Sequence, residues 1–524
     1  MIERILTVGG FTLLSRLTGF ARDIVMAAVL GAGPVADAFL VAFRLPNHFR
    51  AIFAEGAFNA AFVPAYTRIR EQAGPQQVGL FADRIFTLLL ASQILLLGLA
   101  LCFTPDVIRV LAPGFDRDPS RFTLAVDLTR ITFPYLLMMT LVTLYGGILN
   151  ALNRFAAAAA APILLNLAMI ATLVAARLFP SAGHAAAWGV LISGFLQVAL
   201  VLAGVIRANA VPRFRWPRWD ADVKAFFVAL GPAVIGSGSV QLALFADTII
   251  ASFLPVGAIS ALYYADRLNQ LPIGVIGIGV GTVLLPEMSR RIAAGDEAGA
   301  HHSQSRAIEL TLLLSLPCVA AFLIAPDLIM RALFGRGAFT AADAQAAGAT
   351  LAAYAIGLIP FVLIRSVVAT FQARGDTATP VKAALIAAVV NIAFKVLLMG
   401  PLAQVGLAVA TSIGAWINFA LVLWFGTRAG LTRFDAELGR SLSRLGAAAL
   451  ILAATLWIGQ SVLHGLLSAS RGFRAPLELA ALAALGALFY GGAVIGLLGR
   501  RWLVGLGRQP ALTAREHGVI ITSR

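Results

Sequence analysis

Five arginines lie inside stretches of this sequence that otherwise read as membrane-spanning helices: Arg16, Arg22, Arg44, Arg50 and Arg267. A charged side chain at the centre of a bilayer costs about 3 kcal/mol on insertion scales. We therefore expect these arginines to face one another across a water-filled cavity, or to face an anionic ligand. Because a planar guanidinium group can hold two phosphate oxygens at once, a phosphate or pyrophosphate group would suit such a cluster. The pattern predicts a transporter of a negatively charged substrate.

Nearby carboxylates offer a second explanation for these arginines. The acidic residues close to them in the sequence are Asp23, Asp37, Glu55 and Asp266. If each arginine only neutralised one carboxylate, the pairs would fix helix packing and bind nothing. Four carboxylates are too few for five arginines, so the excess positive charge favours a ligand. Arg16 lies two helical turns before Asp23, and their side chains share one face of a helix.

Composition places the chain among membrane proteins. It has 524 residues, of which 60% are hydrophobic and 12% charged, whereas about 25% of the residues are charged in ordinary soluble domains. Apolar runs of about 20 residues, long enough to cross a hydrocarbon core of about 30 Å, recur from end to end. The formal net charge of +15 resides mostly in short loops beside helix ends. Membrane orientation explains that excess better than nucleic-acid binding, so no nucleic-acid partner is expected.

The apolar runs predict fourteen membrane spans, with helix bends at Pro46, Pro272 and Pro360. An even number of spans places both termini on the same side, where roughly 24 basic residues lie in the loops against roughly 8 opposite, so this side is predicted to be cytoplasmic. The predicted spans are 5–30, 35–66, 80–103, 125–150, 157–178, 185–206, 224–254, 258–288, 306–325, 345–371, 379–399, 402–425, 441–463 and 476–499.

The chain also contains an internal repeat. Thr104-Pro105-Asp106-Val107-Ile108 returns as Ala325-Pro326-Asp327-Leu328-Ile329, and Arg44-Leu45 returns as Arg267-Leu268. Both pairs are separated by about 222 residues and by six spans, which predicts two parallel halves related by an axis along the membrane normal. We therefore expect an all-α polytopic membrane protein with two six-helix lobes around a central cavity. The predicted parts are an N-terminal lobe (1–215), a C-terminal lobe (216–435), two extra transmembrane helices (436–505) and a cytoplasmic tail (506–524).

Seven motifs along the chain are characteristic in their residues and order. They are Ser15-Arg16-Leu17-Thr18-Gly19-Phe20-Ala21-Arg22-Asp23, Asp37-Ala38-Phe39, Arg44-Leu45-Pro46-Asn47, Phe53-Ala54-Glu55-Gly56-Ala57-Phe58, Ala112-Pro113-Gly114-Phe115, Tyr263-Tyr264-Ala265-Asp266-Arg267 and Leu284-Leu285-Pro286. These motifs resemble those of a known family, the MurJ (MviN) lipid II flippases. The resemblance covers essentially the whole chain, and it is most specific in the first 65 residues.

The resemblance implies a fold, a substrate and a setting. The fold is that of the multidrug/oligosaccharidyl-lipid/polysaccharide exporter superfamily, with twelve core helices and two extra ones that would form a groove for a lipid tail. The substrate is the undecaprenyl-pyrophosphate-linked peptidoglycan precursor, moved from the cytoplasmic to the periplasmic leaflet of the bacterial inner membrane. This activity belongs to peptidoglycan biosynthesis, cell-wall biogenesis and cell shape. The resemblance also implies that the protein is a monomer, and that the peptidoglycan-synthesis machinery is a candidate partner.

Functional residues can be carried over from the matching motifs. Arg16, Arg22, Asp37, Arg50 and Arg267 match cavity residues of the family, and the substrate-binding set predicted from the residues also includes Arg44. One departure is Gln270, three residues after Arg267, where relatives often have a glutamate. The role of this position is therefore open.

A second departure concerns ion coupling. In some relatives the resemblance implies a sodium site, which Asp247, Asn391 and Thr411 match, but Lys395 replaces its second acidic residue. We hypothesise that the Lys395 ammonium pairs with Asp247 and takes the place of sodium. The alternative, in which Lys395 extends to the outer membrane interface, stays open. No cofactor and no metal site are expected, and sodium is disfavoured.

Three other functions compete with that of a lipid II flippase. An exporter of another lipid-linked oligosaccharide or of drugs would share the fold, but cavity arginines would repel cationic drugs. An enzyme acting on phosphorylated lipids would need a nucleophile or base, and no such pair stands at suitable spacing. A scaffold would give no reason to keep arginines in the membrane.

The lysines Lys224, Lys382 and Lys395 do not follow glycine, which excludes a P-loop. Transport would draw on membrane potential, an ion gradient or consumption of the product.

Overall fold

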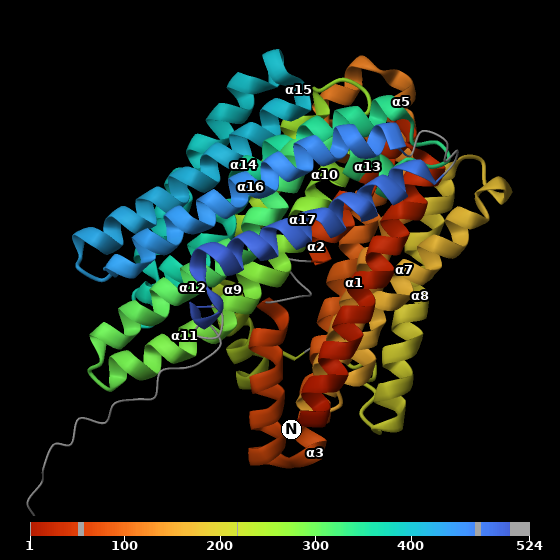
Figure 1. Ribbon diagram of the computed structural model, residues 1–524. Coiled ribbons are helices and arrows are strands. Elements are labelled where there is room, and N and C mark those ends of the chain that lie inside the picture. Colours follow the sequence, from red (N-terminus) through yellow and green to blue (C-terminus); the bar gives the residue numbers. More distant parts are fainter. Residues whose placement is uncertain (1, 51–56, 217, 467–472, 503–524) are drawn as a thin grey trace, which may run out of the picture. The chain divides into compact units, whose positions relative to one another are not determined.

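The computed structural model describes residues 2–50, 57–216, 218–466 and 473–502, and every regular element in these ranges is helical (Figure 1). Ten of the helices described are long and apolar enough to span a membrane. The prediction of an all-α polytopic membrane protein is therefore confirmed. The predicted tail, 506–524, lies outside the described residues.

The helices belong to two compact units, made of the described parts of 1–269, 326–354 and 387–414 and of 270–325, 355–386 and 415–524. Helices α14 (Ala341–Gln372) and α15 (Ala378–Arg428) have parts in both units. The first unit also holds α1 (Ile2–Leu30), α2 (Pro34–Arg50), α3 (Phe58–Cys102), α4 (Thr104–Leu111), α5 (Pro119–Thr132), α6 (Pro134–Ala151), α7 (Ala156–Val174), α8 (Ala182–Arg207), α9 (Ala221–Ser252), most of α10 (Ala258–Pro272) and α13 (Pro326–Phe334). The second also holds α11 (Ile278–Ala293), α12 (Glu297–Ile324), α16 (Ala436–Leu466) and α17 (Arg474–Leu498).

Packing within each unit follows the apolar faces of these helices. In the first unit α1, α7 and α8 lie side by side, and α3 packs on α6 and α9 (Figure 1). Buried phenylalanines join α3 to α9: the ring of Phe226 lies edge-on to those of Phe58 and Phe81, with centroids 5.7 and 6.1 Å apart. In the second unit α16 and α17 form an antiparallel pair, and α16 also packs on α12.

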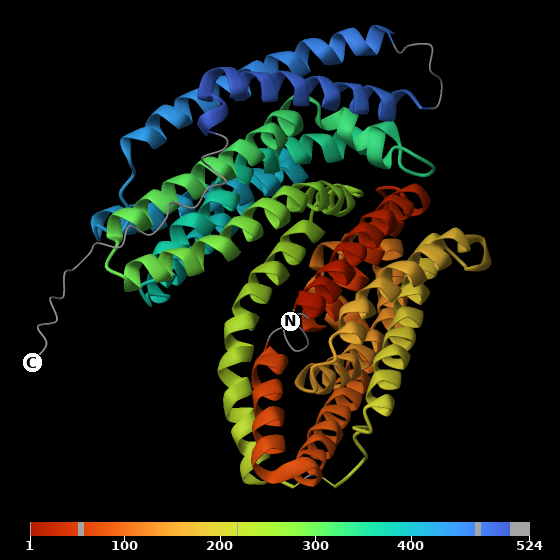
Figure 2. The same ribbon diagram turned by 60° about the horizontal axis from the view of Figure 1, so that its bottom comes forward.

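Two of the longest helices are interrupted. The backbone of α3 leaves the helical region at Gly74, with φ of 80°, and its two arms fold back on each other there (Figure 2). The backbone of α15 is interrupted at Ala403, with φ of 46°. The break in α15 falls at the second residue of the predicted span 402–425, and the break in α3 precedes the predicted span 80–103.

The internal repeat marks two short helices that were not predicted. The repeated Pro-Asp words lie in the first turn of α4 and of α13, each directly after a long helix. Proline favours the first turn of a helix, because its missing N–H would be unpaired there in any case. The proline therefore restarts a helix where the predicted span had ended.

The turn after α13 packs closely against the end of α1. Gly337 has φ of 60°, and a Cβ on it would lie 2.2 Å from the Ala28 carbonyl oxygen. The next residue, Ala338, donates its N–H to the same oxygen over 2.7 Å. Only glycine fits this position, because both the left-handed backbone and the close contact exclude a side chain.

Gly337→Ala should therefore lower the thermal unfolding midpoint of the purified protein in detergent. Gly430 is the matched control, since it has φ of 68° but open space around a Cβ. Gly430→Ala should cost only the left-handed backbone term of about 1–2 kcal/mol. Gly337→Ala should cost a further 1–3 kcal/mol or so through overpacking. Equal shifts for the two variants would show that the turn is not tightly packed.

Candidate functional site

A charged network in the first unit is centred on the carboxylate of Asp23 in α1. Asp23 and Arg22 are only 2% and 5% exposed. Oδ1 of Asp23 accepts hydrogen bonds from Nη2 and Nε of Arg22, over 2.6 and 3.0 Å, and from the hydroxyl of Tyr263 over 2.9 Å. Its other oxygen, Oδ2, lies 3.2 Å from Nε of Arg267. Residues that are about 240 positions apart in the sequence thus share one carboxylate.

Asn166 of α7 fixes the orientation of Arg22. Nη1 of Arg22 donates to Oδ1 of Asn166 over 3.1 Å. The amide nitrogen of Asn166 donates in turn to the Ser15 carbonyl over 3.0 Å and to the Thr18 hydroxyl over 3.1 Å. A Cβ on Gly19 would lie 3.4 Å from that nitrogen, so the glycine leaves room for this contact between α1 and α7.

Arg267 is held by α10 but remains accessible. It lies one turn after Tyr263, donates to the Tyr263 hydroxyl over 3.1 Å and has its guanidinium carbon 5.0 Å from the ring centroid. The side chain is 37% exposed. Two guanidinium groups thus contact one carboxylate, that of Asp23. The neighbouring Asp266 also acts electrostatically on Arg267. Two guanidinium groups and two carboxylates therefore lie close together, with the accessible side chain of Arg267 at their edge.

Arg16 lies near this network without joining it. Along α1 it precedes Asp23 by seven residues, or about 10 Å, on the same face. The side chain is exposed, and among the described residues no hydrogen bond or ion pair to it is found. Arg16 is therefore a free cation on the face of α1 that carries Asp23.

The other predicted substrate residues occupy different places. Nη1 of Arg44 donates to the buried hydroxyl of Thr248 in α9 over 2.9 Å. Arg50 ends α2, but its side chain and the whole of Glu55 lie outside the described residues. Gln270 follows Arg267 by three residues and is exposed. The structure thus brings Arg22 and Arg267 together, and places Arg44 in a separate contact.

Asp37 is enclosed by protein groups and positions the start of α10. It is 0% exposed. Its oxygens accept from the Gly257 N–H over 2.7 Å, from the Ser260 N–H and hydroxyl over 2.9 and 2.6 Å, and from Nη2 of Arg121 over 3.0 Å. Because α10 carries Tyr263, Asp37 acts on the network by fixing the helix that supplies its partners.

Arg121 itself is placed by the cap of α5. The Asp118 carboxylate accepts the backbone N–H of Ser120 and of Arg121, both over 3.2 Å, and the Ser120 hydroxyl over 2.7 Å. The hydroxyl contact, followed by the backbone contacts, holds the pKa of Asp118 below its usual value. The cap thus stays ionised at neutral pH, and α5 starts where Arg121 can reach Asp37.

The ion-coupling candidates form one direct contact. Nζ of Lys395 in α15 lies 2.5 Å from Oδ1 of Asp247 in α9, and Lys395 is only 4% exposed. Asn391 donates to the Ala410 carbonyl over 3.0 Å, which joins the two arms of α15. Thr411 donates to a carbonyl of its own helix. A buried ammonium therefore already occupies the carboxylate of Asp247.

Three residues of these contacts were missed in the sequence. Tyr263 could have been found from its spacing of four residues before Arg267, which places both on one helix face. Asn166 could have been noticed as an amide in the apolar stretch that became α7. Arg121 gave no signal, because its partner Asp37 lies 84 residues away.

Comparisons with known proteins identify relatives over nearly the whole chain. Residues 26–471 match the family described as "Lipid II flippase MurJ". A "Probable lipid II flippase MurJ" of Rhizobium meliloti (strain 1021) is 42% identical over 93% of this chain and 91% of its own length. A "Lipid II flippase MurJ" of Burkholderia cenocepacia (strain J2315) is 34% identical over 94% of this chain and 96% of its own.

Solved structures show the same fold. A structure described as "Lipid II flippase MurJ, inward closed conformation" has a TM-score of 0.77 and covers 94% of this chain and 99% of its own, at 22% identity. An inward-facing multidrug resistance MATE family transporter of the MOP superfamily has a TM-score of 0.64, covering 81% of this chain and 98% of its own, at 14% identity. At these identities the likeness concerns the fold alone.

The enclosure of Asp37 predicts that Asp37→Ala lowers stability. Loss of this carboxylate leaves Arg121 buried without its partner, which costs about 3–5 kcal/mol. The thermal unfolding midpoint in detergent should fall markedly. Asp116→Ala, at an exposed position nearby, should leave it unchanged. An Asp37→Ala protein as stable as the parent would place this carboxylate outside the structural core.

Proposed function

Because the chain belongs to the family of the lipid II flippase MurJ, we propose that it moves lipid II across the bacterial inner membrane, from the cytoplasmic to the periplasmic leaflet. This is a family of transporters, not of enzymes, and its activity serves peptidoglycan biosynthesis. The chain covers more than nine tenths of the R. meliloti and B. cenocepacia proteins, and the family match spans both units.

The observation that carries the proposal is the network of Arg22, Asp23 and Arg267. A pyrophosphate group is highly charged, and moving it through hydrocarbon without cationic partners would be prohibitive. In the proposal the exposed edge of Arg267 receives the pyrophosphate, and Arg16, which lies about 10 Å before Asp23 along α1, is a further cation. The proposal also assigns substrate binding to Arg44 and Arg50. Asp37 contributes by holding α10 rather than by touching the substrate.

Alternating access between two lobes supplies the proposed route. The lobes are 1–215 and 216–435, with fourteen spans in all and both termini in the cytoplasm. The short helices α4 and α13, which begin at the repeated Pro-Asp residues, support a duplicated architecture of this kind. The apolar pair α16 and α17 would offer the undecaprenyl tail a groove, so that the tail stays in lipid while the headgroup crosses.

The Lys395–Asp247 pair is assigned to energy coupling. A sodium ion that approached Asp247 would meet the Lys395 ammonium already 2.5 Å from the carboxylate, and the two cations would repel each other. We infer that Lys395 takes the place of a sodium ion, and that transport draws on membrane potential or another gradient. The Arg44–Thr248 contact lies beside this pair in α9, next to Asp247.

A second candidate is an exporter of another lipid-linked oligosaccharide or of drugs, in the same superfamily. The MATE-like fold favours it only at the level of architecture. The accessible guanidinium groups of Arg267 and Arg16 disfavour cationic drugs, because like charges repel. An anionic lipid-linked substrate satisfies both the fold and the network.

Arg16→Ala, Arg22→Ala and Arg267→Ala should each reduce flipping roughly 10- to 100-fold while leaving folded protein in the membrane, since a hydrogen bond to a charged group contributes about 1.5–3 kcal/mol. Flipping is measured by leaflet-specific labelling of lipid II. Arg267→Lys should give an intermediate rate, because it keeps the charge and loses the two-pronged geometry.

Arg109→Ala is the matched control for these variants. It removes an exposed arginine that pairs with Asp106 within α4, and it should leave flipping unchanged. Full complementation of a flippase-depleted strain by all three arginine variants would show that these arginines do not bind the substrate.

Flipping by the parent protein should proceed at the same initial rate in sodium and in choline buffers. Lys395→Ala should slow flipping and make the residual rate depend on sodium, because Asp247 loses its partner. Lys382→Ala, at an exposed position on the same helix, should do neither. A parent protein that needs sodium would contradict the role assigned to Lys395.

A further inference from the structure

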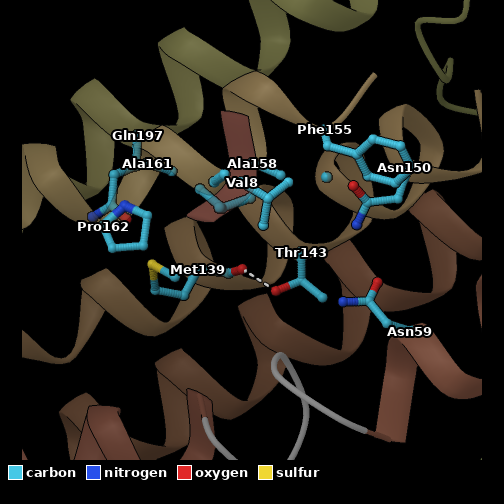
Figure 3. Close-up of a pocket in the computed structure, with 13 residues that line it drawn as sticks. Val8, Asn59, Met139, Thr143, Asn150, Phe155, Ala158, Ala161, Pro162 and Gln197 are labelled. Carbon is cyan, nitrogen blue, oxygen red and sulfur yellow. Dashed lines mark hydrogen bonds between the residues drawn. The ribbon is translucent and has the colours of Figure 1, made fainter. Parts of the chain in front are cut away.

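A neutral pocket lies in the first unit, between α1, α3, α6, α7 and α8 (Figure 3). Its volume is about 360 Å³, within the range of small-molecule sites. Every side chain that lines it is uncharged. Asn59, Thr143 and Asn150 gather at one end of the pocket, and Gln197 lies at the other with apolar residues between.

The amides at the first end make no side-chain hydrogen bond within the described part of the chain. Oδ1 of Asn59 is buried and has no hydrogen-bond partner there. The side chain of Asn150 makes no hydrogen bond to any residue that the structure describes. Thr143 donates to the Met139 carbonyl over 2.9 Å, so its oxygen remains free to accept. An unpaired buried polar group costs about 1–3 kcal/mol, which a ligand with matching donors and acceptors would offset.

The pocket is lined by α1 and α7, two of the helices that also build the charged network. Pro162 lines it and lies one turn, or about 6 Å, before Asn166, the residue that holds Arg22. Val8 lines it too and lies about 21 Å before Arg22 along α1. A substrate whose pyrophosphate sits at the network could therefore extend its headgroup into this pocket.

We propose that this pocket is a subsite for the uncharged, amide- and hydroxyl-bearing part of the lipid II headgroup. Carboxamides both donate and accept hydrogen bonds, so they complement sugar hydroxyls and amide groups without attracting charge. The inference rests on the proposed function, because it takes the pyrophosphate to be bound at the network. It adds a division of labour: arginines select the diphosphate, and amides select what is attached to it.

The test compares the binding of two lipids to the full-length protein in nanodiscs. Lipid II carries the headgroup, whereas undecaprenyl pyrophosphate carries only the diphosphate. Asn59→Leu with Asn150→Leu should weaken lipid II binding about tenfold or more, since each lost hydrogen bond costs up to a factor of about ten. Binding of undecaprenyl pyrophosphate should not change. Asn150→Asp keeps the shape of the side chain and removes its donor, and it should also weaken lipid II alone.

Controls separate this inference from the proposed function. Asn418→Leu makes the same change at another amide with an unpartnered oxygen, in α15, and should affect neither lipid. Arg267→Ala should weaken both lipids. If the double asparagine variant weakens both lipids equally, or neither, the subsite is overturned. If Arg267→Ala leaves both affinities intact, the proposed role of the network fails, whatever the asparagine variants do.

Discussion

The shared carboxylate of Asp23 is the constraint on which the site depends. Arg22 and Arg267 would repel each other if they met alone in a desolvated place, and Asp23 lets both approach. Asp266 also acts electrostatically on Arg267, whose side chain stays accessible at the edge of the network. The Tyr263 hydroxyl bridges the remaining distance by donating to Asp23 and accepting from the arginines. A pair of positive side chains is thereby held ready without a bound anion.

The rest of the first unit serves to hold that arrangement. Asn166 ties α7 to α1 behind Arg22, and Asp37 ties α2 to the start of α10. Each tie is a buried side chain with several partners, so losing one partner leaves the others unsatisfied. The geometry of the network is therefore set by contacts among four helices, not by any one of them.

Sequence patterns predicted the helices well and the contacts less well. Apolar periodicity located the long helices, and the break at Ala403 falls within two residues of the predicted start of a span at 402. The short helices α4 and α13 were missed, because eight or nine residues are too few for a periodic signal. Charge in an apolar setting singled out Arg22 and Arg267, yet nothing local to Asp37 reveals that Arg121 and Ser260 surround it. Such partnerships arise from packing across long sequence separations, which a pattern along the chain does not contain.

The interruption of α15 has a mechanical consequence. Ala403, where the two arms of α15 meet, is a non-glycine residue with positive φ, a backbone conformation that costs about 1–3 kcal/mol. The Asn391 amide donates a hydrogen bond from one arm to the Ala410 carbonyl of the other, so the two arms are coupled. The ion pair between Lys395 and Asp247 connects the first of these arms to α9. If the Lys395–Asp247 ion pair were broken, both arms would be released from α9 together, because the Asn391 hydrogen bond joins them.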